Sequence, residues 1–155
     1  MFLGGALLGV LVFVLVFGVS TLDVTNDAFC RGGYIEKDIQ QHYAGWLFYR
    51  SSAPGWPLGV TQAVNAPQGV SVAYTDSIPL LAVLCRPLAA ALGGTFQYFG
   101  WFTLVCFALQ GGFAALLCGL FAEGLAAPLA GSLVFAASPI LLERAFRHTS
   151  LGAQW

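Results

Sequence analysis

The sequence predicts an all-α, polytopic helical membrane protein with three transmembrane helices, or four if one short apolar stretch also crosses the bilayer. Two observations predict this class. Apolar residues make up 58% of the chain and charged residues only 8%, whereas a soluble domain carries roughly 25% charged residues. The charges are also segregated, because residues 2–22 and 87–122 contain none. Such a chain alternates between lipid and water.

The first predicted transmembrane helix is residues 2–20. These nineteen residues would span about 28 Å as a helix, which is close to the thickness of the hydrocarbon core. The segment contains Gly5-x-x-x-Gly9, a spacing that lets a second helix approach closely.

Residues 21–77 are predicted to form one long loop outside the hydrocarbon, because they are polar and punctuated by Gly and Pro. Within the loop, residues 36–50 have the periodicity of an amphipathic helix lying along the membrane interface. The apolar stripe of this helix comprises Ile39, Tyr43, Trp46 and Leu47. The opposite, water-facing stripe comprises Asp38, Gln41, His42 and Gly45.

Residues 78–93 form a short apolar stretch that contains Pro79, Arg86 and Pro87. An arginine at the bilayer centre costs about 2.5–3.5 kcal/mol. We therefore expect a juxtamembrane or re-entrant helix with Arg86 near the headgroups, and a short transmembrane helix is the alternative.

The two remaining predicted transmembrane helices are residues 96–122 and 125–142, followed by a polar tail over residues 143–155. Residues 96–122 carry Gln110 and a ridge of small residues suited to helix packing, namely Gly111, Ala115 and Gly119. With three crossings, the tail emerges on the same side as the long loop. That topology predicts one membrane face that gathers Asp38, His42, Asp76, Arg144, Arg147 and His148.

Several of these residues are suited to chemistry. Asp38 and His42 are four residues apart on the predicted helix, so they form either an ordinary ion pair, a metal site, or a base with its orienting partner. Asp76 either caps the helix that follows it or belongs to a site. The cluster of Arg144, Arg147 and His148 suits an anionic group such as a lipid phosphate, or anchors the helix end by snorkelling.

Composition also excludes some functions. The chain has six basic and seven acidic side chains and no basic run, so it lacks the patch that nucleic acid requires. The four cysteines show no C-x-x-C spacing, and the three that lie in apolar runs, Cys85, Cys106 and Cys118, are predicted to be packing residues.

The order of these parts resembles the N-terminal part of the GT-C superfamily of polytopic membrane glycosyltransferases. The stretches DIQQHYAGWLFYR, WPLG, YTDSIPLLAVLCRPL and FQYFGWFTLVCFALQGGFA are similar to those of a largely uncharacterised bacterial membrane-protein family assigned to that superfamily. The resemblance implies a multi-pass protein of the bacterial inner membrane that transfers a sugar from a polyprenyl-phosphate donor to an extracytoplasmic acceptor.

The resemblance also implies roles for particular residues. Asp38 would be the catalytic base or a metal ligand, with Mg or Mn as the metal. His42, Asp76, Arg144, Arg147 and His148 would bind substrate around it. Superfamily members have more transmembrane helices, so the chain is expected to be a fragment of a larger polytopic protein, or to take further membrane helices from another chain.

Two other functions stay open. A non-enzymatic membrane subunit or scaffold would use the glycine ridges to bind partner helices, and a small transporter component would use Gln110 and Arg86 as intramembrane polar sites. The orientation is also open. All six Lys and Arg residues lie in or beside the loop and tail, which the positive-inside rule places in the cytoplasm, whereas the resemblance implies an extracytoplasmic loop.

Overall fold

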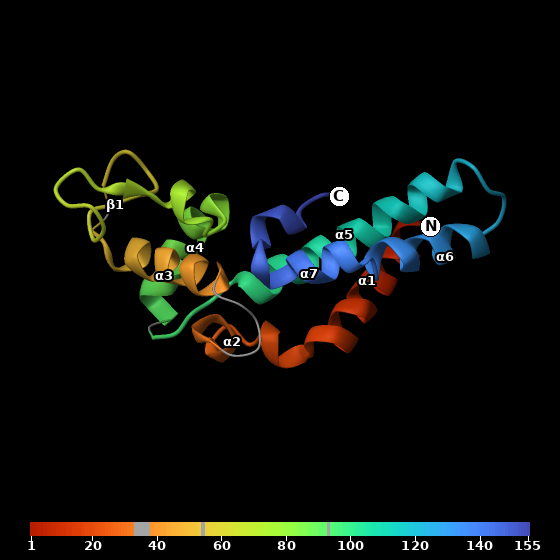
Figure 1. The fold of residues 1–155 in the computed structure, drawn as a ribbon, viewed down its shortest axis with the longest axis horizontal. Helices are drawn as coiled ribbons and strands as arrows, with labels where there is room; N and C mark the ends of the chain where they lie inside the picture. Colours follow the sequence, from red (N-terminus) through yellow and green to blue (C-terminus); the bar gives the residue numbers. More distant parts are fainter. Residues whose placement is uncertain (33–37, 54, 93) are drawn as a thin grey trace. The chain divides into compact units, whose positions relative to one another are not determined.

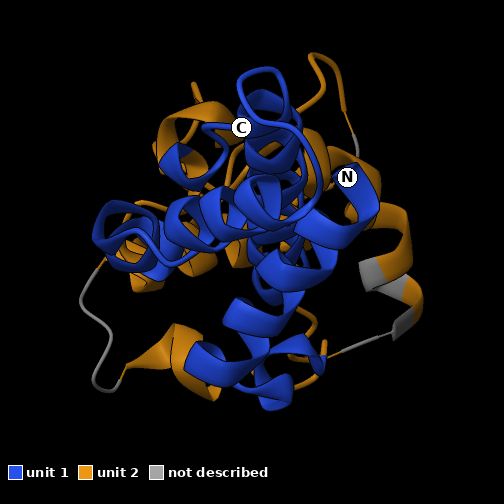
Figure 2. Ribbon diagram, turned by 90° about the vertical axis from the view of Figure 1, so that its right-hand side faces the viewer, with its two compact units in different colours: residues 1–23, 99–146, 151–155 blue, residues 24–98, 147–150 orange. Residues whose placement is uncertain are grey.

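The computed structural model describes residues 1–32, 38–53, 55–92 and 94–155, and it is mostly helical (Figure 1). This confirms the helical part of the predicted fold class. The chain divides into two compact units, which are coloured separately in Figure 2. Unit 1 comprises residues 1–23, 99–146 and 151–155, and unit 2 comprises residues 24–98 and 147–150.

Unit 1 is a helical bundle in which α1 packs against α5 and α6, and α5 packs against α6. Its elements are α1 (Phe2–Phe17), η1 (Val19–Leu22), α5 (Phe99–Gly119), α6 (Ala126–Ala136) and α7 (Pro139–Arg147), of which α7 belongs to unit 1 as far as Phe146. A short 3-10 helix, η3 (Thr149–Gly152), is divided between the two units.

The contact between α1 and α5 depends on glycines. A Cβ atom at Gly9 would collide with the carbonyl oxygen of Phe107, and one at Gly5 would collide with that of Gly111. Gly111 in turn faces the Gly5 carbonyl, and Ala115 lies against Gly5. The predicted small-residue spacings therefore bring the two backbones together inside this unit.

The opposite face of α1 is large and apolar. Leu3, Leu7, Leu11 and Leu15 recur every four residues, and each is at least half exposed. A helix that buries glycine and exposes leucine has the pattern of a lipid-facing helix, because a water-soluble helix buries its large apolar side chains instead.

The lengths of the apolar helices differ from those of the predicted transmembrane helices. Among the described residues, α5 is the one helix long and apolar enough to cross a bilayer, and α6 with α7 would add a second if this bent pair is one broken span. The prediction of a continuous helix over residues 2–20 is wrong, because α1 ends at Phe17 where Gly18 adopts φ 76°. Its 16 residues correspond to about 24 Å.

Residues 125–142 do not form the single helix that was predicted. The segment bends by 44° between α6 and α7, because Pro139 lacks a backbone N–H and disfavours helical geometry at Ser138. The Ser138 hydroxyl then accepts a hydrogen bond from the Leu141 backbone N–H (3.3 Å) at the start of the new helix. The first residues of the predicted polar tail are helical, since α7 continues through Arg147.

Unit 2 contains more regular structure than the predicted loop. It comprises α2 (Ala28–Arg31), α3 (Asp38–Ser51), β1 (Val60–Thr61), β2 (Val70–Ser71), η2 (Val72–Thr75) and α4 (Pro79–Leu92). The two strands pair antiparallel, with Val60 opposite Ser71 and Thr61 opposite Val70. The 14-residue α4 corresponds to about 21 Å, shorter than the hydrocarbon core, and it packs against α3 and η2.

The helix predicted over residues 36–50 forms as α3, with residues 36 and 37 outside the described part. Its environment differs from the prediction. Trp46 is fully buried, donates from Nε1 to the Phe96 carbonyl (2.8 Å), and stacks edge-on against Tyr98. The apolar stripe is therefore covered by protein, and the prediction that it lies on the membrane interface is wrong.

The opposite stripe of α3 is also covered in part. Gly45 is buried, and a Cβ atom there would collide with Thr75 and Ser77. The chain around Ser77 thus lies directly on this face, and the Ser77 hydroxyl donates to the His42 carbonyl (2.6 Å). The placement of His42 and Gly45 on a water-facing stripe is therefore wrong.

Candidate functional site

Unit 2 contains five of the six residues predicted to share one face. Asp38 and His42 lie on α3, Asp76 follows η2, and Arg147 and His148 belong to the stretch 147–150. The sixth residue, Arg144, lies on α7 in unit 1. Two carboxylate–imidazole contacts join four of these residues, one between His42 and Asp76 and one between His148 and Asp38.

His42 is the buried centre of the site. Its side chain is 4% exposed, its Nε2 atom lies 3.7 Å from Oδ2 of Asp76, and its Nδ1 atom lies 3.3 Å from Oγ1 of Thr149. Burial lowers the pKa of His42 below its ordinary value of 6.5, while Asp76 and Asp38 act in the opposite direction. Burial is the larger effect, so the imidazole is neutral at pH 7.

The two contacts of His42 fit one neutral tautomer. With the proton on Nε2, the ring presents a donor toward the Asp76 carboxylate, and Nδ1 accepts from the Thr149 hydroxyl. The other oxygen of Asp76, Oδ1, accepts from the Ser150 hydroxyl at 3.0 Å. Asp76 is thus contacted from two sides, by the His42 ring and the Ser150 hydroxyl, while its side chain stays 52% exposed.

The backbone at Asp76 adopts an uncommon conformation. Asp76 has φ 57° and Ile78 has φ 51°, and a β-branched residue with positive φ is rare. Each such residue costs of order 1–3 kcal/mol and persists where the surrounding structure determines it, often at functional sites. Between them, the buried Ser77 accepts on its backbone carbonyl a hydrogen bond from the Tyr98 hydroxyl.

Asp38 forms the second carboxylate–imidazole pair. It lies in the first turn of α3, where a negative charge is favoured by the helix dipole. Its Oδ2 atom lies 3.3 Å from Nδ1 of His148, and both side chains are about half exposed. Asp38 therefore has water access and an imidazole partner, whereas His42, one turn further along α3, is enclosed.

The arrangement suits proton transfer better than metal binding. No group of three His, Cys, Asp or Glu side chains in the part of the chain that the structure describes could hold a metal ion. The two carboxylates instead face different imidazole rings. The Mg or Mn expected at Asp38 therefore stays a prediction.

Some residues of the site were not predicted from the sequence. Thr149 and Ser150 directly follow His148, and their hydroxyls contact His42 and Asp76. The run of four polar residues from Arg147 to Ser150 was a signal for this. Gly45 and Ser77 were not recognised, because their role depends on the close approach of two distant segments.

Comparison with known proteins identifies a family. A family model described as a domain of unknown function (DUF6311) matches residues 6–155. It carries no glycosyltransferase assignment. No curated protein and no solved structure matches the chain.

Proposed function

The chain belongs to the DUF6311 family, and we propose that it acts as a membrane glycosyltransferase, or as the N-terminal module of one, in the bacterial inner membrane. The donor would be a polyprenyl-phosphate sugar and the acceptor an extracytoplasmic hydroxyl. One observation carries the proposal: two half-exposed carboxylates, Asp38 and Asp76, each face a histidine within one compact unit.

Asp38 is the residue that we assign as the general base. Its exposed carboxylate takes the proton of the acceptor hydroxyl, and the acceptor oxygen then forms a bond to the anomeric carbon. The bond between that carbon and the phosphate oxygen breaks, and the lipid phosphate leaves with the electron pair. His148 keeps the Asp38 carboxylate in position.

Other residues of unit 2 support this step. We assign Arg147 and His148 to the departing phosphate, because a guanidinium binds phosphate oxygens in bidentate fashion. Asp76, held by His42 and Ser150, accepts a hydrogen bond from a sugar hydroxyl. His42 is too enclosed to contact substrate, so it is a positioning residue for Asp76.

The test measures sugar transfer in membranes that contain the whole chain. The donors are polyprenyl-phosphate glucose, mannose and galactose with tritiated sugars, and the readout is loss of label from the lipid fraction. Asp38→Asn should lower the rate by about 10²- to 10⁴-fold, which is the usual contribution of a general base. Glu123→Gln is the matched control, because it also replaces a carboxylate with an amide, at an exposed residue of unit 1.

Two results would contradict the proposal. Transfer by Asp38→Asn at the rate of the unmodified protein would remove Asp38 from its role. Absence of transfer from every donor, in membranes where the chain is folded and the native helices of its host are present, would remove the function.

The two alternative functions, scaffold and transporter component, differ in the structural support that they keep. The scaffold function relied on glycine ridges for partner helices, but Gly5, Gly9 and Gly111 already pack against each other's helices within unit 1. The transporter function keeps one supporting observation. The Oε1 atom of Gln110 on α5 is buried without a hydrogen-bond partner among the described residues.

Gln110 also lines a hollow of about 230 Å³ with Phe113 and Trp155. As a second candidate function, we propose a transport role in which Gln110 binds the solute. Solute flux into proteoliposomes that is lost on Gln110→Leu would support this role, and a tight bilayer with the unmodified chain would contradict it.

A further inference from the structure

A hollow in unit 2 is lined by residues other than Asp38 and Asp76. Its volume is about 440 Å³, and its walls come from the end of α3, the loop after it, and α4. Arg50 and Arg86 line it together with the apolar side chains of Leu58, Val83 and Pro87. No acidic residue of the described part lines this hollow, so its charge is positive and its walls are largely apolar.

The guanidinium of Arg86 is held in place without being neutralised. It donates to the Ser52 carbonyl and lies 4.7 Å from the centre of the Tyr49 ring. A guanidinium has five N–H donors, and among the described residues no carboxylate lies within ion-pair distance of this one. Arg86 is therefore oriented, charged and available to an anion.

Arg50 adds a second guanidinium to the same hollow. It donates from its Nη1 atom to the Gly94 carbonyl at 2.7 Å and lies over the Trp46 ring. Two guanidinium groups beside one hollow suit a phosphate, because a guanidinium can offer paired N–H donors to phosphate oxygens.

The outer face of α4 continues the apolar wall. Leu80, Leu84 and Leu88 are each more than half exposed and recur every four residues. Around the axis of a helix with 3.6 residues per turn, Pro87 and Val83 lie next to this stripe, and Arg86 lies next to Val83. The charged hollow thus opens onto an apolar strip, which a small hydrophilic anion would leave uncovered.

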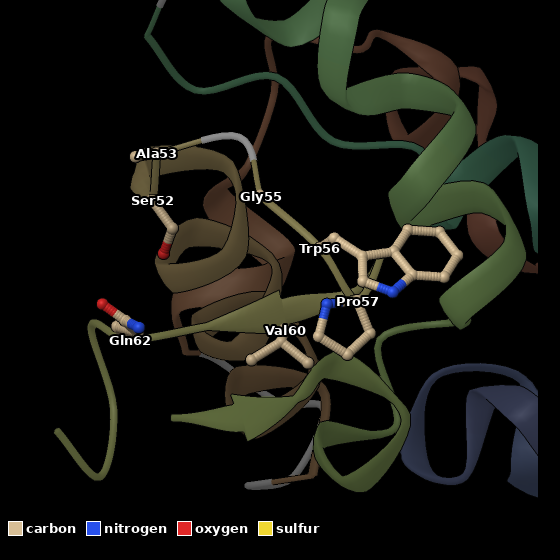
Figure 3. A pocket seen from close by; sticks show the side chains of 7 residues that line it. All are labelled: Ser52, Ala53, Gly55, Trp56, Pro57, Val60 and Gln62. Carbon is tan, nitrogen blue, oxygen red and sulfur yellow. The ribbon is translucent and has the colours of Figure 1, made fainter. Parts of the chain in front are cut away.

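The loop beside the hollow has further exposed apolar residues. Leu58 and Trp56 are both largely exposed, Trp56 at 86%. Figure 3 shows Trp56 and Pro57 on one side of the neighbouring pocket, and Ser52 and Gln62 on the other. Tryptophan is enriched at the headgroup level of membranes because its ring is apolar and its N–H is polar.

We propose that this hollow binds the headgroup phosphate of an anionic phospholipid. Arg86 and Arg50 contact the phosphate, and the acyl chains lie along Leu80, Leu84 and Leu88. The site is separate from the proposed glycosyl-transfer site, so it holds whether or not that function is correct.

The test measures lipid retention by native mass spectrometry of the whole chain in detergent. Phosphatidylglycerol and phosphatidylcholine are the two lipid probes, and free glycerol phosphate tests for a simple anion site. We expect retention of phosphatidylglycerol over phosphatidylcholine. Arg86→Gln should weaken that retention by about tenfold or more, because a charge-assisted hydrogen bond contributes about 1.5–3 kcal/mol.

Two further variants keep the test decisive. Arg31→Gln removes the same charge from an exposed position in unit 2 and should retain the lipid preference. Leu84→Ser alters only an exposed position on α4, so it folds even if Arg86→Gln does not, and it should weaken lipid retention.

Three results would overturn the proposal. The first is equal retention of the two lipids by the unmodified chain. The second is unchanged retention in both Arg86→Gln and Leu84→Ser. The third is binding of free glycerol phosphate as tight as binding of phosphatidylglycerol, which would identify an anion site with no lipid component.

Discussion

The Nε2 atom of His42 lies 3.7 Å from Oδ2 of Asp76, yet the imidazole is 4% exposed and the carboxylate 52% exposed. The pair therefore joins the interior of unit 2 to its surface. A buried neutral ring can orient an exposed carboxylate without competing with substrate for it. This division of roles makes Asp76 a contact residue and His42 a positioning residue in the proposed site.

The burial of His42 predicts a pH dependence of stability. Burial lowers the pKa of His42 below 6.5, so between the lowered pKa and 6.5 the unfolded chain binds more protons than the folded one. Stability therefore rises with pH through this window and is lost as the pH falls below about 6.5. Thermal unfolding of the detergent-solubilised chain at a series of pH values should show this loss.

His42→Gln should flatten that dependence, because glutamine does not titrate. The comparison is the slope of stability against pH, since the substitution also changes the stability itself. An unaltered slope below pH 6.5 would show that another group is responsible.

The contact of α1 with α5 predicts a large effect of one methyl group. Gly9→Ala places a Cβ atom against the Phe107 carbonyl, and overpacking of this kind costs typically about 1–3 kcal/mol. Gly55→Ala is the matched control, because its Cβ would meet nothing within 4 Å, and it should change stability by less than about 0.5 kcal/mol. Equal unfolding temperatures for the two variants would argue against the close helix contact.

A buried hydrogen bond in unit 2 predicts unequal effects of the same substitution. The Tyr43 hydroxyl donates to Oδ2 of Asp27 at 2.7 Å, and both residues are buried. Tyr43→Phe removes this donor and should cost about 1.5–3 kcal/mol, since the acceptor is a carboxylate. Tyr74 is 82% exposed, so Tyr74→Phe should be nearly neutral. The difference between their free energies of unfolding is the measurement, and its absence would contradict the contact.

Cysteine labelling tests both the fold of unit 2 and the side of the membrane that the proposed function requires for it. Cys30 is fully buried, and burial raises the pKa of its thiol, so it should react with an impermeant maleimide only after denaturation. The probe for orientation is Tyr74→Cys in a chain with Cys85, Cys106 and Cys118 changed to Ser. Labelling on intact cells would support an extracytoplasmic site, and labelling only after lysis would contradict the proposed glycosyl transfer.

The sequence predicted the helical elements better than their ends. Residues 96–122 were predicted as one helix, and α5 covers Phe99–Gly119. The errors occur at Gly18, where a residue with positive φ ends α1, and at Pro139, where a residue without a backbone N–H interrupts the predicted helix. The apolar sequence continues through both positions. Hydropathy reports the solvent around a segment and does not report local backbone geometry.

For the site, the sequence predicted which residues lie near one another but not how they pair. The spacing of Asp38 and His42 predicted neighbouring side chains on α3, and the polar tail predicted Arg147 and His148 near them. The spacing did not show that Asp38 pairs with His148 while His42 faces Asp76. Those pairings join segments that are far apart in the chain.

Two properties of this protein were determined by the sequence alone: its helical class and the segregation of its charged residues into a few segments. Both follow from local composition and periodicity. The tertiary structure decided which face of α3 is enclosed, because Gly45 leaves room for the segment around Ser77. That approach buries His42 and leaves Asp76 exposed, and a contact between distant segments of this kind has no signature in either segment.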